Sequence, residues 1–312
     1  METVTIIGAA GAIGSSIFVE LHRQRLFKTF NLVDPRKNVL ESYRIDLAEA
    51  SIAASEESSN INVYEPKEAV GAGTASDLVI CAATKGEKPG LSRSSFAAMN
   101  WELLRSLMPL IEAAVKPQGT VLLVSNPIDV LAARLARESA VLGANRILGY
   151  SLNDSTRLRA VMAMELGVDP KRVSAQALGM HGEVLVPLFS DAKVNGKPVD
   201  LSASQRERIV EWMDGWFDRW QELESGRSST WSTAVGVALM VTAMRGRQVM
   251  PTSIETSGVD FLPNGSFIAL PAVLEPGRAY PDPLFGQDLD AEEREKLITA
   301  AEQVKAMSDG LS

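Results

Sequence analysis

The chain has 312 residues, of which 46% are hydrophobic and 22% are charged, so it is long enough for two lobes that each bury a core. This composition excludes the disordered and fibrous classes. The net charge of -8 argues against a nucleic-acid or anionic-membrane partner, because both require a basic surface on the protein.

The only cysteine, Cys81, cannot form a disulfide within the chain, and it lies in an apolar, strand-like run. We therefore expect a buried thiol. The apolar N-terminal run has Glu2 in place of a basic segment and is interrupted by glycines, so it is unlike a signal peptide. No other apolar stretch is long enough to span a bilayer, and we predict a cytoplasmic protein.

The chain opens with a strand over residues 3–7, a glycine turn and a helix that continues over 15–25. Glycines let a backbone approach a pyrophosphate, and the helix N-terminus offers N–H groups to the anion. The next strand, 30–33, ends at Asp34, where a carboxylate accepts a hydrogen bond from a ribose 2′-hydroxyl. We predict NAD as the cofactor, since Asp34 repels a 2′-phosphate, although Arg36 would attract one. The turn residues expected to contact the cofactor are Gly8, Gly11, Ala12, Ile13 and Gly14.

Strands alternate with helices as far as residue 149, which predicts a doubly wound parallel sheet of the Rossmann type. We assign residues 1–149 to an NAD-binding domain and 150–312 to an α+β substrate-binding and catalytic domain. In the second domain the Asn195-Gly196 dipeptide predicts a hairpin. The further strands and helices are expected at 61–65, 76–83, 120–124, 146–148, 253–259 and 266–273, and at 92–114, 128–138, 202–224, 230–245 and 290–307.

His181 lies between two glycines at the end of an expected strand, 173–178. A side chain that titrates near neutrality on a tight turn suits proton transfer, although a lone histidine can also simply cap a turn. Asp154 and Arg157 are three residues apart and share a helical face, as either a functional pair or a surface ion pair. Trp212, Trp216 and Trp220 form a stripe along the 202–224 helix, which we interpret as packing rather than ligand binding.

In combination these motifs resemble the lactate/malate dehydrogenase family over essentially the whole chain. The matching motifs are the glycine turn with Asp34, the 88–93 loop, Asn100, Ser125-Asn126-Pro127, Asp154 with Arg157, and Gly179-Met180-His181-Gly182. The resemblance implies that the 84–93 stretch is a lid that closes over substrate, rather than only a solvated loop. It also implies an assembly of two or four copies, with a small 2-hydroxy or 2-oxo acid as substrate.

The resemblance also assigns roles to single residues. His181 is the acid/base, Asp154 orients it, and Arg157 grips the substrate carboxylate with a planar fork of N–H donors. Arg93 in the lid polarises the C2 oxygen. Asn126 is similar to the asparagine that hydrogen-bonds substrate and nicotinamide, and Asn100 is expected to help bind the cofactor.

The sequence departs from the family pattern at Glu87, six residues before the lid arginine. Malate dehydrogenases carry an arginine there and lactate dehydrogenases a glutamine, whereas the rest of the chain is closer to the malate branch. A dicarboxylate facing Glu87 would lose on the order of 4 kcal/mol at about 4 Å and an effective dielectric near 20. Alternatively, Lys85 or Lys88 could supply the missing cation, or Glu87 could point to solvent. Asn153 is a second departure, since an apolar residue usually precedes the aspartate.

We therefore predict an NAD-dependent L-2-hydroxy acid dehydrogenase. The alternative from another class is a non-catalytic NAD(H)-binding relative that acts as a sensor or structural protein. An NAD-dependent glycoside hydrolase would need metal ligands, and we expect no metal site because no second cysteine or histidine is evident near Cys81.

Overall fold

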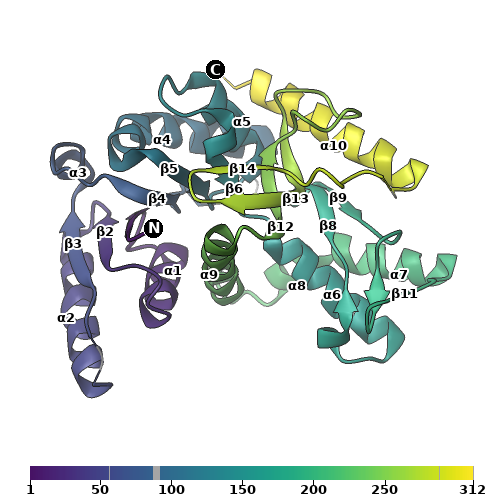
Figure 1. Ribbon diagram of the computed structural model, residues 1–312, viewed down its shortest axis with the longest axis horizontal. Coiled ribbons are helices and arrows are strands. Elements are labelled where there is room, and N and C mark those ends of the chain that lie inside the picture. The colour runs from purple at the N-terminus through teal and green to yellow at the C-terminus, as the bar shows by residue number, and fades with distance from the viewer. Residues whose placement is uncertain (56, 87–91, 288, 312) are drawn as a thin grey trace.

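In the described part of the chain, one mixed sheet of eleven strands runs through the molecule, and helices cover both of its faces (Figure 1). The structure is a computed structural model that describes residues 1–55, 57–86, 92–287 and 289–311. The N-terminal half of the sheet is formed by β1 (Thr3–Ile7), β2 (Thr29–Val33), β3 (Asn60–Tyr64), β4 (Ser76–Cys81), β5 (Val115–Leu123) and β6 (Ile147–Gly149). These strands are parallel and lie in the order β3-β2-β1-β4-β5-β6. The doubly wound sheet of the Rossmann type is thereby confirmed.

The strands of the second half extend the same sheet in antiparallel fashion. They are β8 (Ala177–Met180), β9 (Val184–Pro187), β12 (Val249–Glu255), β13 (Phe267–Glu275) and β14 (Arg278–Pro281). β12 pairs with β6, β13 with β12, and β8 with β13, while β14 also pairs with β13. A separate small sheet contains β7 (Val173–Ser174), β10 (Lys193–Val194) and β11 (Lys197–Pro198). The sheet therefore links the two halves of the chain through backbone hydrogen bonds.

Helices α4, α5 and α10 lie on one side of the large sheet, and α1 and α9 lie together on the other (Figure 1). The helix bounds are α1 (Ala12–Arg23), α2 (Lys37–Ala53), α3 (Pro66–Gly71), α4 (Arg93–Ala114), α5 (Ile128–Glu138), α6 (Leu152–Leu166), α7 (Ala203–Asp214), α8 (Trp216–Glu222), α9 (Thr230–Gly246) and α10 (Ala291–Asp309). Short 3₁₀ turns occur at Ala144–Arg146 and Pro170–Arg172. The α1–α9 contact buries apolar side chains of both helices, so it joins the first part of the chain to the second.

Most expected elements are present, with several differences. The strand expected over 253–259 starts earlier and ends earlier, as β12. The helix expected over 202–224 is wrong as a single element, because the chain breaks at Gly215 into α7 and α8. The strand expected over 173–178 is divided into β7 and β8, which belong to different sheets. Helices α2 and α3 and strands β9 and β14 had no counterpart in the prediction. The hairpin at Asn195-Gly196 is confirmed, with both residues at positive φ of 53° and 76°.

Buried apolar side chains of the described residues form two clusters. The larger contains the inner faces of the main sheet and the helices that cover it, and the smaller lies among α6, α7 and the small sheet. Cys81 is buried in the larger cluster, and burial raises the pKa of its thiol to about 11, as expected for an unreactive side chain. Within the described ranges, no helix combines the length and the apolar character needed to cross a bilayer.

Candidate active site

Two glycines of the turn between β1 and α1 lie where a side chain would have no space. A Cβ on Gly8, which has φ of 81°, would lie 2.7 Å from the backbone nitrogen of Ala83. A Cβ on Gly14 would overlap the carbonyl oxygen of Gly8. The turn therefore packs tightly against the neighbouring strand and leads directly into the N-terminus of α1. This is the backbone shape that the pyrophosphate of a dinucleotide requires.

Asp34 lies directly after β2, beside the glycine turn, with a side chain only 5% exposed. Its Oδ2 accepts a hydrogen bond from the backbone N–H of Ala10 at 3.2 Å, and its Oδ1 accepts one from Arg36 Nε at 3.0 Å. The Arg36 side chain is 57% exposed, so it covers the carboxylate from the solvent side. The carboxylate expected to bind the ribose is thus next to the pyrophosphate turn, as the spacing in the sequence predicted.

His181, Asp154 and Arg157 form one connected cluster. His181 Nδ1 lies 2.5 Å from Asp154 Oδ2, and Arg157 Nη1 donates to Asp154 Oδ1 at 3.1 Å. The Asp154 side chain is 2% exposed, whereas those of His181 and Arg157 are 16% and 18% exposed. A buried carboxylate therefore binds both side chains, which themselves reach the surface of the site. The surface ion pair considered for Asp154 and Arg157 is wrong, because Asp154 is buried and shared with His181.

Ser155 brings the helix that carries Asp154 against the strand that carries His181. Its Oγ accepts a hydrogen bond from the backbone N–H of Ala177 at 3.0 Å and donates one to the carbonyl oxygen of the same residue at 3.3 Å. At the other end of β8, Gly179 has φ of 88°, and a Cβ there would overlap the carbonyl oxygen of Val184. This close approach of β8 and β9 allows the turn that presents His181.

Asp129 on α5 is a site residue that the sequence did not reveal. Its Oδ2 accepts a hydrogen bond from the backbone N–H of His181 at 2.7 Å, and the residue is 1% exposed. Burial raises the pKa of this carboxyl to about 6, although the hydrogen bond from His181 opposes the rise. The signal available in the sequence was an acid on the otherwise apolar face of the 128–138 helix, two residues after Pro127.

Burial alone would lower the pKa of His181, but the charge and hydrogen bond of Asp154, together with the charge of Asp129, raise it above the usual histidine value. His181 Nδ1 is hydrogen-bonded to Asp154 Oδ2, which accepts, so Nε2 is the nitrogen left to exchange a proton with a ligand. The arrangement therefore holds the imidazole in one orientation and favours its protonated form. Such a group can donate a proton to a carbonyl oxygen.

Asn126 is exposed and precedes Pro127 through a cis peptide bond, at the carboxyl end of β5. Asn100 is instead 2% exposed, and its side-chain oxygen accepts hydrogen bonds from Thr84 Oγ1 at 3.0 Å and the Lys85 N–H at 2.9 Å. Its amide nitrogen donates to the carbonyl oxygen of Phe96. The Asn100 side chain thus binds the first two residues of the 84–93 stretch, Thr84 and Lys85.

Four of the residues considered in the sequence concern the expected lid. Glu87 and Lys88 lie outside the described residues, as does the side chain of Arg93, whose backbone begins α4. Lys85 is described and exposed. The roles expected for these side chains remain predictions.

Asn153 is accommodated by polar partners rather than by apolar packing. Its Oδ1 accepts a hydrogen bond from the Tyr150 hydroxyl at 2.8 Å, and its Nδ2 donates to Thr233 Oγ1 at 3.0 Å. Tyr150 also packs against Gly236 of α9, where a Cβ would overlap its hydroxyl. The departure at Asn153 therefore forms a buried hydrogen-bonded link between α6 and α9, and Asp154 keeps its position beside it.

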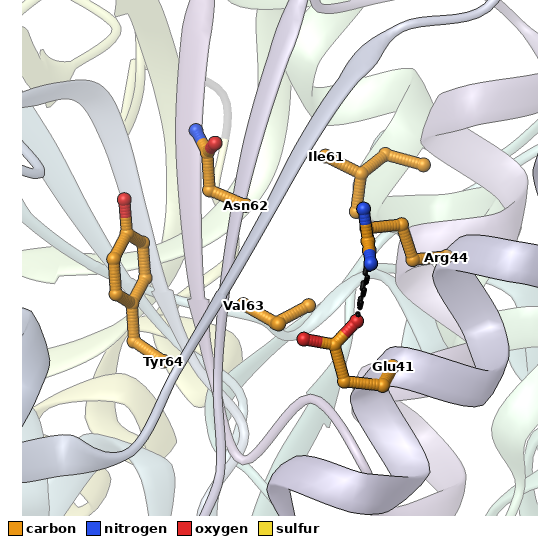
Figure 2. Close-up of a pocket in the computed structure, with 6 residues that line it drawn as sticks. All are labelled: Glu41, Arg44, Ile61, Asn62, Val63 and Tyr64. Carbon is orange, nitrogen blue, oxygen red and sulfur yellow. Dashed lines mark hydrogen bonds and ion pairs between the residues drawn. The ribbon is translucent and has the colours of Figure 1, made fainter.

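A shallow hollow of about 260 Å³ lies far from this cluster, between α2 and β3 at the outer edge of the sheet (Figure 2). Its two charged side chains, Glu41 and Arg44, form an ion pair with each other at 2.8 Å. β3 is at the opposite end of the sheet from β8, which presents His181. The hollow is therefore separate from the His181 cluster.

The comparisons with known proteins agree with this architecture. Residues 2–149 match the model of the lactate/malate dehydrogenase NAD-binding domain, and residues 152–310 match that of the family's alpha/beta C-terminal domain. Malate dehydrogenase from Trichlorobacter lovleyi is 29% identical over 99% of this chain and 97% of its own length.

Two solved structures are similar over nearly their full length. The malate dehydrogenase from Aeropyrum pernix has a TM-score of 0.86 and 25% identity, covering 99% of this chain and 98% of its own. The minor L-lactate dehydrogenase from Enterococcus mundtii shares the fold, with a TM-score of 0.84 and 23% identity over 100% of this chain and 98% of its own. Because the family models cover nearly the whole chain, the protein belongs to the lactate/malate dehydrogenase family and is an NAD-dependent oxidoreductase of that type.

Proposed function

We propose that the protein reduces a 2-oxo acid to the L-2-hydroxy acid, and catalyses the reverse oxidation, with His181 as the acid/base. The observation that carries the proposal is the shared carboxylate of Asp154, which binds a histidine on one side and an arginine on the other. A histidine and an arginine held together are suited to a substrate that has a carbonyl next to a carboxylate. Binding of NAD alone would not require this cluster, which argues against the non-catalytic alternative.

In the reduction, Arg157 binds the substrate carboxylate through the N–H donors that Asp154 does not use. His181, protonated and oriented by Asp154, donates its Nε2 proton to the C2 oxygen. Bound NADH supplies the hydride that C2 accepts. The exposed amide of Asn126 supports the substrate at the carboxyl end of β5, and Arg93 enters the site when the lid closes.

The test is a panel of 2-oxo acids mixed with NADH and the protein, with the loss of NADH absorbance followed over time. We expect turnover with at least one of pyruvate, oxaloacetate and 2-oxo acids with hydroxylated or amino-bearing tails. A complete lack of turnover with a panel of this breadth, while NADH still binds, would instead favour the non-catalytic alternative.

The pH dependence of the reduction should report the raised pKa of His181. The protonated imidazole is the reactive form, so kcat/KM for the 2-oxo acid should be constant at low pH and fall as pH rises through that pKa. In Asp154→Asn the charge that raises the pKa is lost, and the break should move to lower pH by about 1 unit or more. The exposed Asp169→Asn carries the same change in charge and should leave the break where it is. An unmoved break in Asp154→Asn would contradict the assigned pairing.

We further propose that Glu87 selects against dicarboxylates, on the basis of its charge and its place in the 84–93 stretch. Glu87→Arg should raise kcat/KM for oxaloacetate by about tenfold or more relative to pyruvate, since an attractive charge replaces a repulsive one. Glu207→Arg, an equal change of charge on the exposed surface of α7, is the control. If the ratio of the two substrates is unchanged, Glu87 does not contact the substrate tail.

We also propose that the protein forms a homo-oligomer through α9. One face of this helix buries apolar residues against α1, but Trp231, Val235 and Leu239, spaced four apart, are 71%, 46% and 52% exposed. An exposed apolar stripe of this kind is typical of an interface. Leu239→Asp should lower the mass measured by sedimentation, whereas Leu284→Asp, at another exposed leucine, should not. A monomeric wild type at micromolar concentration would refute this assignment.

A further inference from the structure

The guanidinium of Arg157 lies on an aromatic side chain that comes from a different helix. Its Cζ is 3.4 Å from the ring centroid of Trp216, the first residue of α8. Trp220, one turn later, stacks with Trp216 at a centroid distance of 5.3 Å and an interplanar angle of 19°. The indole Nε1 of Trp220 donates a hydrogen bond to the carbonyl oxygen of Arg227 at 2.8 Å. The stack is thus anchored to the segment that joins α8 to α9.

The contact with Trp216 determines which hydrogen-bond donors of the Arg157 guanidinium are available to a ligand. An arginine donates hydrogen bonds in its own plane, and its faces are the parts that stack on aromatic rings. Trp216 occupies a face, and Asp154 takes one in-plane donor at Nη1. Asp154 is the only hydrogen-bond partner of this guanidinium among the residues that the structure describes. The remaining in-plane donors are therefore held at a fixed tilt and are available to a carboxylate.

Trp216 differs in its surroundings from its neighbour in the stripe, Trp212. Trp212 packs against the smaller apolar cluster, and its ring is covered by Arg219. Trp216 belongs to neither apolar cluster formed by the described residues, and it is partly exposed. In one continuous helix, Trp212 and Trp216 would share a face. The break at Gly215 instead places Trp212 on α7 and Trp216 on α8. Core packing therefore accounts for Trp212 but not for Trp216.

We propose that Trp216 is a positioning residue for substrate binding, which holds the plane of the Arg157 guanidinium in the orientation that grips the substrate carboxylate. This inference rests on the role of Arg157 in the proposed function. The attraction between a cation and an indole face supplies the force, and the stacked Trp220 limits the movement of the ring. Trp216 acts on the affinity for the carboxylate and leaves the proton transfer at His181 unaffected.

The test compares Trp216→Phe with Trp216→Leu. Leucine keeps the apolar character but has no aromatic face, so the KM for the best 2-oxo acid of the panel should rise by about tenfold. The kcat should change less than twofold, and the KM for NADH should be unchanged. Phenylalanine restores an aromatic face and should recover most of the loss. The matched control is Trp212→Leu, in which both KM values should remain those of the wild type.

Equal defects in Trp216→Phe and Trp216→Leu, or an equal defect in Trp212→Leu, would overturn the inference, because general packing would then explain them.

A binding measurement tests the role of Trp216 separately from the proposed function. Calorimetric titration of oxamate, a carboxylate with an adjacent carbonyl that is not reduced, into the complex with NADH should show a dissociation constant about tenfold higher in Trp216→Leu than in wild type. This difference supports the inference even if no 2-oxo acid is turned over. Oxamate binding that does not depend on Trp216, or that is absent in wild type, contradicts it.

Discussion

His181→Asn is expected to lower kcat for 2-oxo acid reduction by about a thousandfold, the range lost when a positioned general acid is removed. Asparagine is polar and can accept or donate a hydrogen bond, but it cannot release a proton to the C2 oxygen. The variant should fold, because Asp129 binds the backbone N–H of residue 181 and not its side chain. The measurement is the steady-state rate of NADH oxidation at saturating substrate.

The control for this variant is His22→Asn, which changes the only other histidine of the chain. His22 lies on α1 and packs near the rings of Phe18 and Phe30, away from Asp154. We expect this variant to keep its turnover at temperatures where it remains folded. Both variants should bind NADH as the wild type does. A His181→Asn enzyme that retained more than a tenth of the wild-type kcat would exclude His181 as the acid.

Arg157→Lys is expected to lower kcat/KM by about 100-fold, mostly through KM, as follows from a loss of about 3 kcal/mol in a partly buried charged contact. Lysine keeps the positive charge, but its ammonium has no planar fork for a carboxylate and no flat face for Trp216. It would also weaken the bond to Asp154 Oδ1, which in turn holds His181. The measurement is the dependence of the initial rate on the concentration of the 2-oxo acid.

Arg159→Lys is the matched control, since Arg159 is on the same helix but exposed. Its KM for the 2-oxo acid should equal that of the wild type. A KM unchanged in Arg157→Lys as well would mean that a different cation binds the carboxylate, and the exposed Lys85 would become the next candidate.

Local patterns were sufficient to predict the cofactor half of the fold. Apolar runs, a glycine turn and helix starts depend on neighbours within a few residues, and the six parallel strands follow the expected alternation with helices. The 202–224 helix was predicted wrongly, because here the local pattern alone was misleading. Its caps and its tryptophan spacing fitted one continuous helix, whereas the chain breaks at Gly215 between α7 and α8.

The sequence by itself determined which chemical groups are present and roughly where they lie along the chain: the glycines and Asp34 for a dinucleotide, and a histidine, an aspartate and an arginine in the second half. Only the tertiary structure decided how these groups meet. Ser155 brings α6 against β8, and Asp154 binds both His181 and Arg157. Asp129 from α5 accepts a hydrogen bond from the backbone N–H of His181. Trp216 likewise reaches Arg157 from a separate helix. Apart from the Asp154–Arg157 pair on one helix, these contacts join residues 22 to 59 positions apart. Their geometry depends on how whole helices and strands pack, which no local pattern encodes.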